Sequence, residues 1–206
     1  MLDPYFKSLI GALLLSASGL AESAITLELT PLSRTASSVG VGITVFGLGA
    51  GEAPSLGSYD LDLHFDSSHL EYVGTRFGDP TLGNELDVHD FGLNVQAADL
   101  SSTGVLNLFE LSFDSPADLN ALQADSFTLA VVTFTFLQAG SSPLNLAVNA
   151  LADADGDGLT AGVSSATVAP VPLPSAFWLM ATGLTALFGR DRRSAGGVGD
   201  RSVTHL

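Results

Sequence analysis

Three aspartates at alternate positions form the clearest candidate binding site in the sequence. Asp153, Asp155 and Asp157 are separated by small residues and followed by Gly158. This spacing is typical of the start of a calcium-binding loop, because calcium prefers several hard oxygen ligands from a tight turn. Ser164 occupies the position where an EF-hand has a bidentate glutamate, which excludes a complete EF-hand. The pattern therefore predicts either a partial calcium site completed by neighbouring loops or a solvated Asp-Gly turn between strands.

A second acidic row lies earlier in the chain. Asp60, Asp62, His64 and Asp66 alternate with apolar residues, so they share one face of an expected strand. Alternate residues on a strand lie about 7 Å apart, which is a loose spacing for a single ion. We interpret this row as a solvated outer face.

The sequence has no motif that indicates catalysis. A nucleophile elbow, a zinc signature, a phosphate loop and a nicotinamide fingerprint are all missing, and there are 0 cysteines. His69, His89 and His205 have no catalytic sequence context. A hydrolase with paired carboxylates is the alternative hypothesis, and it requires two carboxyl groups in one concave pocket, one of them with a raised pKa.

The charge balance limits the class of partner. The 206-residue chain has 7 basic and 22 acidic residues, a net charge of -15, and between Glu22 and Pro174 only Arg34 and Arg76 are basic. Such a surface repels phosphate backbones, so we expect no nucleic-acid partner. Without cysteine, the single expected domain must be stabilised by packing.

Short alternating runs dominate the centre of the chain. In the clearest run Tyr59, Leu61 and Leu63 point to one side and the acidic row to the other. The pattern predicts an all-β fold, an antiparallel β-sandwich spanning 25–168. Strands are expected at 25–30, 39–45, 57–66, 105–113, 127–137, 144–150 and 162–168, with one short helix at 116–123.

The first residues have the form of a signal peptide. Residues 1–23 contain Lys7, a short apolar centre and small residues suited to cleavage. The apolar part is too short to span a bilayer. The expectation is a signal helix that directs export, and the alternative is a short buried helix of the fold.

The other end has three parts. Residues 169–175 form a proline-rich linker, 176–189 an apolar helix, and 190–206 a basic stop and tail. We expect the apolar part to be a single transmembrane sorting helix, although at 1.5 Å per residue it covers only about 20 Å. The arginines mark the cytoplasmic flank, which places the body outside.

This tail resembles the PEP-CTERM sorting signal of Gram-negative bacteria. The resemblance implies an exosortase-type membrane protease as partner, in species that make exopolysaccharide. A plain tail anchor is the alternative. The residues that carry the resemblance are Val171, Pro172, Leu173, Pro174, Arg190, Arg192 and Arg193, with Leu173 in place of the glutamate of the name motif.

The body resembles the cohesin-like and carbohydrate-binding-module-like sandwich domains. The resemblance rests on segments 39–45, 56–73 and 127–136. It implies a nine-stranded jelly roll that adheres noncovalently to a protein or a polysaccharide. No dockerin-type calcium repeat is present in the sequence.

Together these features predict an exported, envelope- or matrix-associated module that is not an enzyme. Its membrane contact would be through the C-terminal helix, at least transiently, and its ligand an exopolysaccharide or a partner protein. Calcium is the one cofactor the sequence suggests.

Overall fold

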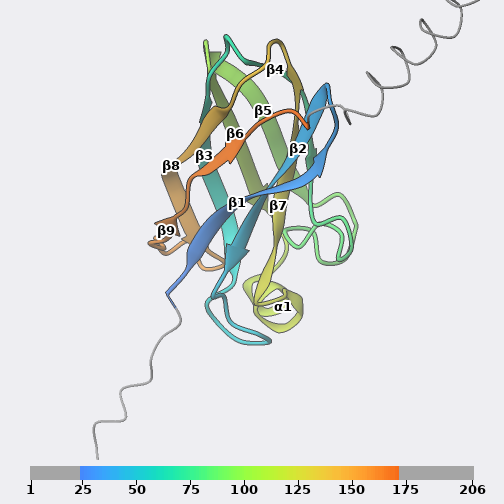
Figure 1. Cartoon of the computed structure of the whole chain (residues 1–206). Coiled ribbons are helices and arrows are strands. Elements are labelled where there is room, and N and C mark those ends of the chain that lie inside the picture. The colour runs from blue at the N-terminus through green and yellow to red at the C-terminus, as the bar shows by residue number, and fades with distance from the viewer. Residues whose placement is uncertain (1–23, 172–206) are drawn as a thin grey trace, which may run out of the picture.

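Apolar and polar side chains alternate along ten strands, and the strands form two five-stranded sheets (Figure 1). The computed structural model describes residues 24–171. The predicted signal helix and transmembrane helix both lie outside these residues. Within residues 24–171 no helix is long and apolar enough to cross a membrane.

The two sheets have a mixed strand order, as expected for a sandwich whose connections cross between layers. All paired neighbours are antiparallel except β1 and β9. The first sheet contains, in spatial order, β4 (Leu70–Phe77), β7 (Ser126–Phe136), β2 (Ser38–Phe46), β1 (Thr26–Arg34) and β9 (Gly162–Val163). The second sheet contains β10 (Ala166–Val168), β8 (Ser142–Asp153), β3 (Leu56–Phe65), β6 (Val105–Ser112) and β5 (Asn94–Ser102).

The core lies between the sheets. Ile43 and Phe134 of the first sheet and Leu61 and Leu108 of the second are all 0% exposed. The Phe134 ring is tilted against that of Phe65, with ring centroids 5.0 Å apart. Burying each large apolar side chain contributes about 1.5–3 kcal/mol, so packing holds the fold without disulfides.

One short helix, α1 (Pro116–Leu122), lies at one end of the sandwich (Figure 1). Ser115 caps it by accepting a hydrogen bond from the Asp118 N–H at 3.2 Å, and Pro116 occupies the first turn, where a missing N–H costs nothing. Gln123 ends the helix, and its side chain donates to the Leu56 carbonyl at 3.0 Å. This contact attaches α1 to the start of β3.

The structure confirms the all-β sandwich and corrects parts of the strand prediction. β4 and β5 were not among the predicted strands, because Gly74 and Arg76 interrupt the pattern of β4 and because β5 is mostly polar. The expected strand 162–168 is two strands: β9 pairs with β1 in the first sheet and β10 with β8 in the second. The division gives ten strands where the resemblance implied nine.

Candidate functional site

Of the three aspartates of the predicted calcium loop, Asp153 ends β8, and Asp155 and Asp157 lie in the turn that follows. Asp153 Oδ1 accepts hydrogen bonds from the N–H groups of Asp155 at 3.0 Å and Asp157 at 2.8 Å. Gly156 adopts a φ of 86°, which glycine tolerates best. The side chains of Asp155 and Asp157 are exposed. Within residues 24–171 no three acidic or histidine side chains gather closely enough to hold a metal ion, and calcium binding stays a prediction.

The sorting motif is described only at its first residue. Val171 is exposed, and its N–H donates to the Thr35 carbonyl at 3.3 Å, beside the turn between β1 and β2. The other residues assigned to the motif lie outside the described part of the chain: Pro172, Leu173, Pro174, Arg190, Arg192 and Arg193.

The acidic row of β3 forms part of a polar cluster on the outer face of the second sheet. Asn107 Nδ2 donates to Asp60 Oδ1 at 2.7 Å and to Asp62 Oδ1 at 3.0 Å. Asn149 Nδ2 donates to Asp60 Oδ1 at 3.1 Å. Strand register places Asp99 of β5 opposite Asn107. We call Asp60, Asp62, Asp99, Asn107 and Asn149 the acidic–amide cluster.

Neutral amides surround Asp62, one carboxylate of this cluster. The amide of Asn107, followed by that of Asn149, lowers the pKa of Asp62. Among residues 24–171 the carboxylates within ion-pair distance of a basic group are Asp66 and Asp118, and both face histidines. The acidic–amide cluster therefore presents negative charge that no arginine of the described body neutralises.

Asp66, the last member of the predicted row, belongs to the turn after β3. Its carboxylate contacts His69 Nδ1 at 2.9 Å, and Ser68 Oγ lies 3.0 Å from the same nitrogen. A catalytic triad needs serine and aspartate on opposite ring nitrogens, so that histidine can take the serine proton. These three residues therefore form a turn and not a catalytic triad.

Beside the acidic–amide cluster, a row of apolar side chains lies on β5, β6 and the residues next to them; three are exposed, and Phe109 and Leu111 are half-buried. Phe113 is 58% exposed, Val95 46% and Leu93 43%. Register pairs Val95 with Leu111, and the Phe113 N–H donates to the Leu93 carbonyl at 2.7 Å. We call Leu93, Val95, Phe109, Leu111 and Phe113 the apolar strip.

The apolar strip was missed in the sequence because β5 was not predicted as a strand. The odd-numbered positions 109, 111 and 113 of the predicted strand 105–113 are all apolar, and this pattern could have indicated the strip. A strand whose even positions are buried leucines should have polar odd positions if its outer face is only solvated. A contiguous exposed apolar patch is instead typical of an interaction site.

A buried carboxylate fixes the strands that carry this face. Glu110 is 0% exposed and points inward from β6. Its Oε2 accepts from the Tyr59 hydroxyl at 2.9 Å, and its Oε1 accepts from Asn84, Asn94 and Gln96 at 2.7, 2.8 and 2.8 Å. Burial, and then the Glu110 charge, raises the pKa of Tyr59 well above its usual range. The network joins β3, β5, β6 and the loop after β4.

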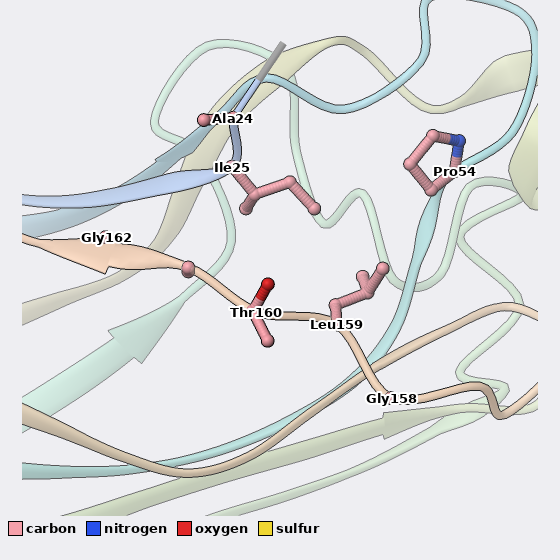
Figure 2. A pocket seen from close by; sticks show the side chains of 8 residues that line it. Ala24, Ile25, Pro54, Gly158, Leu159, Thr160 and Gly162 are labelled. Carbon is pink, nitrogen blue, oxygen red and sulfur yellow. The ribbon is translucent and has the colours of Figure 1, made fainter. Parts of the chain in front are cut away.

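One cavity lies where the start of β1 meets the segment before β9 and the loop before β3 (Figure 2). It measures about 600 Å³, and the side chains of Ile25, Pro54 and Leu159 line it together with Thr160. None of its lining residues is ionisable. This cavity therefore lacks the paired carboxylates that the hydrolase hypothesis requires.

A smaller pocket of about 240 Å³ lies in the loop between β4 and β5 and contains acidic residues. Burial raises the pKa of Glu85, against an opposing hydrogen bond from the Ala124 N–H. Both oxygens of neighbouring Asp87 accept backbone N–H groups, from Phe91 at 3.0 Å and Gly92 at 2.7 Å. Asp87 therefore holds the loop in shape.

Comparison with solved structures shows the fold. No protein-family model and no curated protein matches the sequence. The body is similar to the type II cohesin domain from the cellulosome of Acetivibrio cellulolyticus, with a TM-score of 0.54, 18% identity, and coverage of 70% of this chain and 95% of that one. A non-cellulosomal cohesin from Archaeoglobus fulgidus gives 0.52 and 17%, covering 76% and 98%.

A chain from a type I cohesin–dockerin complex of Clostridium thermocellum gives a TM-score of 0.55 at 13% identity, covering 72% of this chain and 99% of that one. At these identities the likeness concerns architecture alone. The body therefore has a cohesin-like β-sandwich fold.

Proposed function

We propose that this protein is an exported, non-catalytic binding module that engages another protein through the outer face of the second sheet. The observation that carries the proposal is the apolar strip, which lies in the open beside the acidic–amide cluster. The solvated face of a sheet is normally polar, so apolar side chains such as Val95 and Phe113 in this position favour a partner.

The rigidity of the face supports the same proposal. The Glu110 network holds β5 against β6 and fixes the neighbouring loop, so little ordering is required when a partner docks. Structures with this fold include chains from cohesin–dockerin complexes, in which one protein binds another. That precedent supports a protein partner for this chain.

Polysaccharide is a less favourable ligand on the described surface. Sugar rings stack on exposed aromatic side chains. Tyr59 is 1% exposed and cannot serve as such a platform, and Trp178 belongs to the predicted sorting helix. Among residues 24–171 the exposed aromatic side chains that remain for such a role are Phe46, Phe91 and Phe113, at 38%, 72% and 58% exposed.

The proposal includes delivery by the two ends of the chain. A signal peptide at 1–23 would export the protein, and the PEP-CTERM-like tail would bring it to an exosortase-type protease at the membrane. The sandwich would then stand outside the cytoplasm, anchored for at least part of its life. The acidic surface, the absence of cysteine and the cohesin-like fold are compatible with that setting.

Site-specific photo-crosslinking in the source cells tests the docking face. A photoreactive residue placed at Val95 or Phe113 should give a discrete crosslinked protein band. The matched control is Thr133, which register pairs with Gly40 on the first sheet, facing outward from the other layer. Crosslinks of equal yield at Thr133, or none at Val95 and Phe113, would reject the proposal.

A further inference from the structure

We infer that the partner presents a cationic segment in which lysine or arginine side chains alternate with apolar ones. This inference rests on the proposed function and specifies its partner. The cation would lie against the row formed by Asp62, Asn107 and Asp99, and the apolar side chains would lie on the apolar strip.

The row has oxygen atoms available for a cation. Register places Asp62, Asn107 and Asp99 side by side on β3, β6 and β5. The amides beside Asp62, those of Asn107 and Asn149, are neutral donors, so the negative charge of this carboxylate is left for an incoming cation. Asp99 is exposed. Two carboxylates on either side of one amide suit a group that carries several N–H donors, as lysine and arginine do.

The body itself cannot supply that cation. Within residues 24–171 the lysine and arginine side chains are Arg34 and Arg76 alone, and both belong to strands of the first sheet. Arg34 donates to the Thr167 carbonyl at 3.4 Å. No lysine or arginine of the described body therefore compensates the negative charge of the second sheet, which favours association with a cationic surface.

The same charge argues against a second copy of the chain as the occupant. Self-docking through this face would bring Asp60, Asp62 and Asp99 of two molecules together, and like charges at an interface are unfavourable. The apolar strip also limits the choice, because a purely basic segment would leave Val95 and Phe113 uncovered. A segment that alternates basic and apolar side chains matches both halves of the face.

Fluorescence anisotropy with three synthetic peptides tests this inference on the purified protein. The peptides share the same leucines and phenylalanines and differ at two interspersed positions, which are lysine, glutamine or glutamate. The lysine peptide should bind roughly tenfold more tightly than the glutamate peptide at low salt, since two exposed ion pairs contribute up to that factor. The preference should weaken as salt rises.

Two double variants, each of which removes two negative charges, show which sheet is responsible for the preference for the lysine peptide. Asp62→Asn with Asp99→Asn should remove most of the preference for lysine, because the amides keep the shape of the row without its charge. Glu28→Gln with Glu71→Gln, on the first sheet, should leave the preference intact. A preference that survives the first pair, equal affinity for all three peptides, or no binding of the lysine peptide would overturn the inference.

A third variant separates this inference from the proposed function. Val95→Ser with Phe113→Ser should weaken binding of all three peptides, because it removes the apolar contact they share. If that variant weakens binding but charge has no influence, the docking face stands and the cationic partner is wrong. If the serine variant changes nothing, the docking face itself is wrong. Circular dichroism of each variant checks that the sandwich is folded.

Discussion

Glu110 is the residue whose chemistry most constrains the interior. A carboxylate with no exposed surface is stable only when hydrogen bonds replace its lost hydration. Four neutral donors provide that replacement, and three of them converge on Oε1. Because the donors come from β3, β5 and the loop after β4, one side chain holds three separate segments in register.

Glu110→Gln should therefore destabilise the fold by about 3 kcal/mol, because the neutral amide oxygen accepts the three bonds at Oε1 more weakly and the new NH2 group faces the Tyr59 hydroxyl, which donates to Oε2 in the wild type. Chemical denaturation at neutral pH measures the free energy of unfolding. Tyr59→Phe is the graded control: it removes one donor and should cost about 1.5 kcal/mol. Equal losses for the two variants would contradict the central role of Oε1.

Asp79 gives the fold a defined response to acid. Burial alone would raise its pKa, but hydrogen bonds from the backbone N–H groups of Thr81, Thr128 and Leu82 outweigh burial and lower the pKa below its ordinary value of 3.8. A lowered pKa in the folded state means that the ionised group stabilises the fold. This contribution is complete above pH 3.8 and is lost as the pH falls through the lowered value.

Asp79→Asn should lower the free energy of unfolding by about 1 kcal/mol at pH 7, because the uncharged amide accepts these hydrogen bonds more weakly. The gap between variant and wild type should close below pH 3.8, where the wild-type carboxylate becomes protonated. Urea unfolding at a series of pH values measures both effects, with Asp99→Asn as the surface control. A gap that stays constant with pH would show that Asp79 acts through shape alone.

At the scale of elements, the turn between β8 and β9 carries the calcium prediction. Asp153 Oδ1 is already used by two backbone N–H groups, so an ion would have to bind its second oxygen and draw in Asp155 and Asp157. Such a site would be weak, and ligand binding to the folded state raises its melting temperature. We expect a small rise at millimolar calcium that is absent in Asp155→Asn with Asp157→Asn.

Magnesium at the same concentration is the control for ionic strength, because it demands a stricter geometry than this turn offers. An unchanged melting temperature in calcium would leave the turn as a solvated connection. An equal rise in both ions, retained in the double variant, would indicate general screening of the acidic surface.

Strand prediction succeeded where one face is buried and failed at the edges. β3 alternates fully, with Tyr59, Leu61 and Leu63 buried, because it is central in its sheet and packs on only one side. β4 and β5 are edge strands, where little packing selects the side chains, so their sequences are polar or interrupted by Gly74. Sequence alternation alone cannot identify such strands.

The sequence predicted only part of the candidate site, for a related reason. Asp60 and Asp62 were placed correctly on the wet face of β3 by their spacing. Their neighbour Asn107 and the opposite Asp99 depend on which strands lie side by side, and the order β3-β6-β5 follows from tertiary structure. A site formed by three neighbouring strands can be recognised only when the order of those strands is known.

At the scale of the whole molecule, the acidic sandwich and the basic C-terminal segment have opposite electrostatic character. Within the described body only Arg34 and Arg76 are basic, whereas Arg190, Arg192 and Arg193 follow the apolar stretch 176–189. Basic residues after an apolar segment favour retention on the cytoplasmic side. This distribution of basic residues suits the proposed topology, in which the sandwich is exported and the C-terminal tail stays on the cytoplasmic side.

Intact mass spectrometry of the protein purified from cells with and without an active exosortase-type protease tests the proposed export and C-terminal processing. With the protease, we expect a chain that has lost about its first 23 residues and its C-terminal segment from the region of Leu173 onward. Without it, the C-terminal segment should remain and the protein should fractionate with membranes. A soluble cytoplasmic protein of full mass in both strains would refute export, anchoring and processing together, while the folded sandwich and its docking face would be unaffected.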